Sequence, residues 1–195
     1  MIWLISDTHF WHTRILTYCP GRRFTSIEAM NEAYIERWNS VVKSSDVVWH
    51  LGDFAMCNAT NMKALIKRLA GSKNLIMGNH DRKSAQWYMN NGFEWAGTET
   101  VAMYLDGQYF TMSHYPLRLN WMERLRMLFT EPKRLRHLKH MPENIGQFHV
   151  CGHVHNRWRS QRKTLNVGVD MWNGYPVSEE EIIKFTQYGL KGESI

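Results

Sequence analysis

The sequence predicts an α/β fold, because short apolar runs typical of buried strands alternate with segments of helical periodicity through the first half of the chain. The second half is richer in strands and begins with a hairpin signal. Of the 195 residues, 44% are hydrophobic and 22% are charged, which is ordinary for globular proteins and excludes disordered and fibrous classes. We expect a single domain over residues 1–195.

Three buried strands are predicted in the first half, at Ile2–Ile5, 46–50 and 74–77. Each apolar run ends abruptly in a polar loop. Strands that alternate with helices pair mostly in parallel through right-handed crossovers. The three polar loops should therefore meet at the carboxyl edge of one sheet, where α/β proteins build their sites.

Two helices are predicted between these strands. The first begins at the capping-box spacing of residues 25–28 and continues to about Val42. The second covers 62–69 and is closed by Gly71.

The second half predicts a hairpin of strands 98–105 and 108–113 around Asp106-Gly107, a pair that favours tight turns. Two further strands are expected at Phe148–Cys151 and 164–169, and a closing helix at 178–188.

A basic helical insertion is expected at about 117–147. Apolar residues recur at helical spacing from Trp121, which predicts an amphipathic helix, and Pro132 should break it before a second short helix. Two interpretations of this segment remain open. It is a cap whose arginines attract a nucleotide or polyanion, which its position directly after His114 favours, or it is a solvated helical face. Its charged residues are Arg118, Arg124, Arg126, Lys133, Arg134, Arg136, Lys139, Glu123, Glu131 and Glu143.

The net charge of +6 favours anionic partners such as nucleotides or nucleic acid. Three cysteines without any CxxC pair indicate a reducing compartment. The chain lacks an apolar stretch long enough to span a membrane, and its first residues do not resemble a signal peptide. We therefore expect a cytoplasmic protein with no membrane partner, whose oligomeric state the sequence leaves open.

Five clusters of polar residues follow predicted strands and carry side chains that bind metals. Alternate residues of an extended segment point to the same side, so both ends of Asp-x-His and His-x-His can reach one site. A mixture of carboxylate, amide and imidazole groups suits Mn²⁺, Fe²⁺, Zn²⁺, Ni²⁺ or Co²⁺ better than Ca²⁺. The clusters are Asp7-Thr8-His9, Gly52-Asp53, Gly78-Asn79-His80-Asp81, Ser113-His114 and Gly152-His153-Val154-His155.

The order of these clusters resembles that of the calcineurin-like metallophosphoesterase superfamily, and the resemblance extends from residue 7 to residue 155. It implies a four-layer α/β/β/α sandwich and two divalent transition-metal ions, with manganese favoured. It also implies the metal ligands: Asp7, His9 and His155 for one ion, Asn79, His114 and His153 for the other, and Asp53 bridging both.

The resemblance further implies hydrolysis of a phosphoester by a hydroxide shared between the two metals. His80 would act on the transition state or leaving group, and Asp81 would hydrogen-bond to it and raise its pKa. His12, Arg14 and Arg82 are candidate substrate-binding residues from their positions near the clusters, although His12 is equally well explained as a loop histidine. Asp170 is a candidate support for a ligand.

The substrate class is narrowed by two departures from the Ser/Thr protein phosphatases of this superfamily. Those enzymes carry Gly-Asp-x-x-Asp-Arg-Gly and Gly-Asn-His-Glu, whereas this chain lacks that arginine after Asp53 and has Asp81 in place of the glutamate. We therefore favour a phosphodiesterase that acts on a nucleotide or nucleic acid. A phosphomonoesterase and a nucleic-acid-binding module on the same fold are the alternatives.

Overall fold

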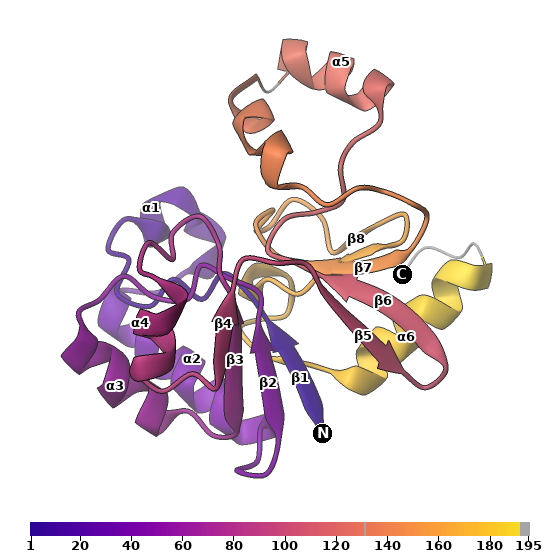
Figure 1. Ribbon diagram of the computed structural model, residues 1–195. Helices are drawn as coiled ribbons and strands as arrows, with labels where there is room; N and C mark the ends of the chain where they lie inside the picture. Colours follow the sequence, from indigo (N-terminus) through magenta and orange to yellow (C-terminus); the bar gives the residue numbers. More distant parts are fainter. Residues whose placement is uncertain (131, 192–195) are drawn as a thin grey trace.

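The computed structural model describes residues 1–130 and 132–191, and its first sheet contains the three predicted strands in parallel (Figure 1). A fourth parallel strand, β4, and an antiparallel edge strand, β10, were not predicted, because each is only two or three residues long. The order is β10-β1-β2-β3-β4. The bounds are β1 Ile2–Ile5, β2 Val47–His50, β3 Ser72–Ile76, β4 Trp95–Gly97 and β10 Val177–Ser178.

Three helices pack against this sheet: α2 (Ile27–Val41), α3 (Ala59–Arg68) and α4 (Ala85–Asn90). The first two confirm the predicted helices, and α4 was not predicted. Ser26 rather than Thr25 caps α2, since its hydroxyl accepts a hydrogen bond from the backbone of Ala29.

The second sheet has the order β5-β6-β7-β9-β8 and confirms the predicted hairpin. Asp106 and Gly107 both have positive φ angles, of 45° and 76°, as a tight hairpin turn requires. The bounds are β5 Val101–Leu105, β6 Gln108–Met112, β7 Phe148–Cys151, β8 Ser160–Gln161 and β9 Thr164–Asn166.

The two sheets share a hydrophobic core to which Leu4 and Ile76 of the first sheet and Phe110 and Val150 of the second contribute. Helix α6 (Glu179–Lys191) packs on β1 and β10 and adds buried side chains to this core. The α/β class, the two sheets and the helical layer α2–α4 of the predicted sandwich are therefore confirmed.

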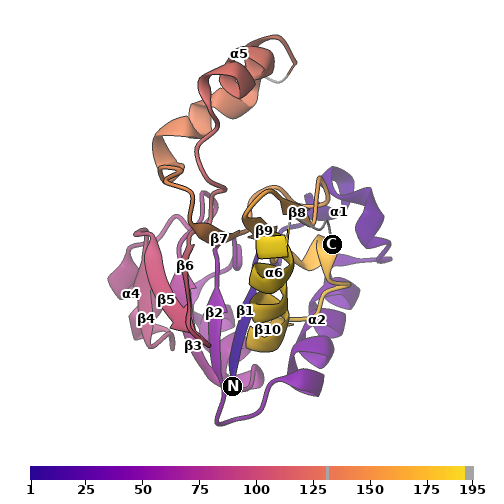
Figure 2. The ribbon, with the colours of Figure 1, turned by 90° about the vertical axis from the view of Figure 1, so that its right-hand side faces the viewer.

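The predicted insertion forms α5 (Trp121–Thr130) and a 3₁₀ helix, η2 (Pro132–His140). The helix ends just before Pro132, as predicted, but the second helix is 3₁₀ rather than α. Both views show this unit standing away from the body of the protein (Figures 1 and 2). None of the described helices is long and apolar enough to cross a membrane.

Three short segments complete the carboxyl edge of the first sheet: α1 (Ile15–Tyr18), η1 (Pro20–Arg22) and η3 (Val169–Met171). The first two follow β1, and η3 follows β9. They bring Cys19, Arg22 and Asp170 beside the loop that begins at Asp7.

Candidate metal centre

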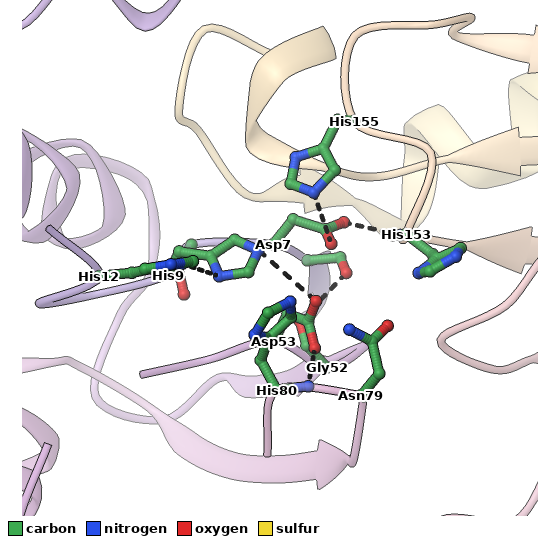
Figure 3. Close-up of polar contacts among 12 residues, drawn as sticks. Asp7, His9, His12, Gly52, Asp53, Asn79, His80, His153 and His155 are labelled. Carbon is green, nitrogen blue, oxygen red and sulfur yellow. Dashed lines mark hydrogen bonds and ion pairs between the residues drawn. The ribbon is translucent and has the colours of Figure 1, made fainter. Parts of the chain in front are cut away.

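The five predicted clusters meet at the carboxyl edge of the first sheet (Figure 3). Parallel pairing puts the ends of β1, β2 and β3 side by side, and the loops after β6 and β7 reach the same place. The residues brought together are Asp7 and His9 after β1, Asp53 after β2, Asn79 and His80 after β3, His114 after β6, and His153 and His155 after β7.

The backbone at this edge is strained in the left-handed region. Asp7, His9, Asp53, His153 and His155 have φ angles of 59°, 51°, 57°, 67° and 49°. This conformation costs a residue other than glycine about 1–2 kcal/mol. Five such residues in one cluster match the way proteins concentrate backbone strain at functional sites.

Two glycines allow the loops to approach closely. A Cβ atom on Gly152 would collide with the Ser6 hydroxyl and the Asp7 carboxylate, and one on Gly78 would collide with the Asp53 carboxylate. Any larger residue would push the predicted ligands apart.

Asp7, His9 and His155 each offer one ligand atom within 4.8 Å of the others. The Oδ1 atom of Asp7 and the Nε2 atom of His9 are buried without a hydrogen-bond partner in the described chain. Such atoms are costly unless something else, such as a cation, binds them. Burial also lowers the pKa of His9 well below its ordinary value, which favours the neutral imidazole that metals require.

The Asp53 carboxylate lies between the two predicted ligand sets. Its Oδ2 atom is 3.5 Å from Nε2 of His9 and 3.6 Å from Nε2 of His114. His114 Nε2 is in turn 3.2 Å from both Asn79 Oδ1 and His153 Nδ1. Asp7, Asp53 and His114 form a second group that could hold an ion.

The buried carboxylates of the cluster favour the binding of a positive charge. Burial raises the pKa of Asp53, and the nearby Asp7 carboxylate raises it further. Burial alone would lower the pKa of His155, but Asp7 and Asp170 together raise it to about 11. The same carboxylates would attract a metal cation in place of that proton. The donor set and the unsatisfied atoms therefore fit the metals that the sequence predicts.

The predicted pairing of His80 with Asp81 is wrong. The Asp81 carboxylate instead accepts hydrogen bonds from the backbone amides of Asp53, Phe54 and Gly78, at 2.6, 3.1 and 2.9 Å. Burial, as the largest cause, lowers the pKa of His80, opposite to the expected rise. Asp81 therefore binds the β2 and β3 loops together, and His80 Nδ1 is buried without a partner in the described chain.

The three candidate substrate-binding residues differ in position. His12 is buried, with its Nδ1 atom 3.2 Å from Nδ1 of His9 and its ring centroid 5.4 Å from that of His80. Arg14 and Arg82 are exposed at the margin of the cluster. Arg82 is near enough for its charge to contribute to the lowered pKa of His80.

Behind His155 lies a buried pair of charges. Asp170 accepts a hydrogen bond of 2.9 Å from Nδ1 of His155, which confirms its predicted supporting position. Arg22 donates to both oxygens of Asp170, at 2.9 and 3.0 Å, and to the backbone oxygen of Asp7, at 2.7 Å. Arg22 thus connects the loop that begins at Asp7 with η3, a contact that sequence reasoning missed.

The insertion reaches the other side of the cluster. The ring of His137 lies 4.7 Å, between centroids, from that of His153. Tyr115, next to His114, stacks on His140 at 5.4 Å. Neither histidine was a predicted site residue, because only the basic charge and the helical periodicity of this segment were recognised in the sequence.

Two facing sheets with these clusters at one carboxyl edge define the class of calcineurin-like phosphoesterases. Residues 1–172 match the model of the calcineurin-like phosphoesterase superfamily domain. The chain belongs to this family, and the family is one of phosphoesterase hydrolases.

Several proteins are similar to this chain over nearly their whole length. An uncharacterized protein of Methanocaldococcus jannaschii is 29% identical over 96% of this chain and 92% of its own. The Gene 66 protein of Mycobacterium phage L5 is 27% identical over 99% of this chain and 97% of its own. The crystal structure of a protein of unknown function from Aquifex aeolicus, 27% identical, aligns with a TM-score of 0.69 over 94% of this chain and 98% of that one.

Proposed function

We propose that this phosphoesterase is a phosphodiesterase that depends on two divalent transition-metal ions and acts on nucleotides or nucleic acid. The observation that carries the proposal is the position of Asp53, whose Oδ2 atom lies about equally far from His9 and His114, one from each ligand set.

The proposed ligands divide into two sets that share Asp53: Asp7, His9 and His155 for one ion, and Asn79, His114 and His153 for the other. When bound, two such ions polarise the phosphoryl oxygens and supply a water-derived nucleophile at neutral pH. Manganese is the favoured metal, and iron, zinc, nickel and cobalt suit the same donors.

His80 is the proposed catalytic residue outside the ligand sets. Its backbone amide donates to Asp53 Oδ1 at 2.8 Å, which fixes the residue beside the proposed bridge. Its side chain is half-buried, so the exposed part of the ring can be reached by a substrate oxygen. His12 packs on the same ring, which supports a role for His12 in contacting substrate.

A cavity of about 660 Å³ lies beneath α5, and none of the proposed ligands is among the described residues that line it. Its position along the segments that carry His114 and His155 supports a substrate that extends beyond a bare phosphate. Its walls come from the segments that follow His114 and His155 and from the insertion. It combines apolar side chains with cations, as a nucleoside joined to a phosphate would require. The residues include Leu117, Met127, Trp158, Arg118, Arg162 and Lys163.

Hydrolysis of bis-p-nitrophenyl phosphate and p-nitrophenyl phosphate, with each metal in turn, tests the proposal. We expect the diester to be cleaved with the higher kcat/KM and Mn²⁺ to give the highest rate. Preference for the monoester would make the protein a phosphomonoesterase. Salt-dependent RNA or DNA binding without turnover of either compound would instead indicate a binding module. Nucleotides, cyclic nucleotides and oligonucleotides then define the natural class.

A further inference from the structure

Helix α5 turns its apolar face toward solvent. Five large side chains follow one another along this face and are at least half exposed, with Phe129 at 83% and Trp121 at 70%. Exposed apolar patches of this kind mark interaction sites. The residues, which we call the α5 stripe, are Trp121, Met122, Leu125, Leu128 and Phe129.

Contacts on the opposite face hold the stripe outward. Glu123 pairs with Arg162 of the β8–β9 turn at 2.7 Å, and Met127 and Thr130 line the cavity beneath the helix. The helix stands well clear of both sheets in the two ribbon views, so the stripe is accessible to a large, flat partner (Figures 1 and 2).

The insertion that carries the stripe is basic. The insertion carries seven basic and three acidic residues in sequence. In the structure Arg124, Arg136 and Lys139 are exposed. Apolar and aromatic side chains on one face of a helix, with arginine and lysine around them, are typical of helices that lie in the interface of anionic membranes.

We propose that the α5 stripe docks on the surface of a membrane containing anionic lipids, with the stripe side chains entering the interface and the exposed cations of the insertion contacting lipid phosphates. Docking on the surface of a membrane does not require a segment that spans it. The proposal therefore departs from the expectation of no membrane partner, which rested on the lack of a spanning apolar stretch. The proposal goes beyond phosphoester hydrolysis and does not depend on it.

Two other occupants fit the stripe less well. A second copy of the chain would bring two basic insertions together, and like charges at an interface oppose association. Single-stranded nucleic acid would complement the charge, but it binds by stacking bases on aromatic rings. Three of the five stripe residues are aliphatic, which favours acyl chains over bases.

Vesicle flotation of the full chain tests the proposal, with vesicles of phosphatidylcholine alone or mixed equally with phosphatidylglycerol. We expect flotation only with the anionic vesicles and less of it at high salt. The double variant Trp121→Ser, Phe129→Ser should bind at least about tenfold more weakly, because it loses the two largest apolar contacts. Tyr104→Ser, Tyr109→Ser is the matched control, since these aromatic residues are 69% and 54% exposed on the β5–β6 hairpin. It should float like the parent.

Two outcomes would overturn the proposal: the parent protein fails to float with anionic vesicles, or the stripe variant floats as well as the parent. If the parent does not float, light scattering and RNA binding identify another occupant. A dimer that the stripe variant separates would indicate a second copy, and RNA binding that the variant loses would indicate a nucleic acid. Circular dichroism and thermal melting of each variant check that the protein is still folded.

Discussion

Asp53 is the residue on which the proposed centre depends most, since its Oδ2 atom lies between His9 of one proposed ligand set and His114 of the other. Asp53→Asn keeps the shape of the side chain but removes its charge. We expect loss of at least one metal ion and a fall in kcat of at least about 100-fold, because the bridge between the ions is weakened. Metal content and diester turnover measure both effects. Asp106→Asn, in the exposed β5–β6 turn, is the matched control and should retain both ions.

His80 should act on the substrate and not on the metals. His80→Ala is therefore expected to retain its full metal content while kcat falls by about 100- to 10,000-fold, the range typical of a lost general acid or base. Near-normal kcat in this variant would contradict the role, and loss of metal would make His80 a structural or ligand residue.

Asp170 should act through His155, whose Nδ1 atom it binds. Removing a hydrogen-bond partner of a ligating histidine weakens metal affinity by about 10- to 100-fold. We expect that range for Asp170→Leu, measured by metal titration, whereas Asp170→Glu should recover part of the affinity. Unchanged affinity in the leucine variant would show that the buried pair with Arg22 only stabilises the fold.

Sequence reasoning finds a site residue when a local pattern marks it, and misses a residue whose contact joins distant parts of the chain. The polar clusters follow apolar strands directly, so the rule that sites form at strand ends located the clusters from local sequence. The proposed ligand roles within them came from the resemblance to the family. The bond between Arg22 and Asp170 joins residues 148 positions apart and has no local pattern. Asp81 was misassigned because it is adjacent to His80 in sequence, whereas the turn after β3 directs its carboxylate toward the backbone of the β2 loop.

At the scale of elements, the length of a helix or strand decided whether it was predicted from the sequence. The long amphipathic α2 and α3 and the apolar cores of β1, β2 and β3 carry enough periodicity to be recognised. The six-residue α4 and the three-residue β4 do not, and β4 is held in the sheet by its parallel pairing with β3. Tertiary pairing of this kind leaves little trace in a short segment.

The connection of α2 to β2 offers a test at this scale. The Asp46 carboxylate accepts hydrogen bonds from the Lys43 amide, at 2.8 Å, and from the Trp3 indole, at 3.0 Å. These bonds lower its pKa from an ordinary 3.8 to about 2. A lowered pKa stabilises the folded state above the unfolded value, and this contribution is lost as the pH falls from 3.8 toward 2.

Asp46→Asn should therefore be less stable than the parent at neutral pH, and the difference should vanish as the pH approaches 2. Urea unfolding of both proteins over this range measures it. A difference in the free energy of unfolding that stays constant with pH would show that the effect is steric. Asp106→Asn again serves as the control, with no pH-dependent difference expected.

At the scale of the whole molecule, the chain consists of a two-sheet body that carries the proposed chemistry and an insertion that forms one wall of the cavity. The two ends of the insertion are adjacent, since the backbone amide of Arg118 donates to the oxygen of Pro142 at 2.8 Å. Residues 120–140 can therefore be replaced by a short Gly-Ser linker without separating the strands on either side.

We expect this excised protein to fold and to bind both metals, because all seven proposed ligands lie outside the insertion. Its kcat/KM for nucleotide diesters should fall by about tenfold or more relative to bis-p-nitrophenyl phosphate, since the wall of the cavity formed by Glu123, Met127 and Thr130 is removed. Thermal melting, metal content and the two kcat/KM values test this. An equal fall for both substrates would instead show that the contact of His137 with His153 supports the metal centre itself, and the insertion would then belong to the catalytic body.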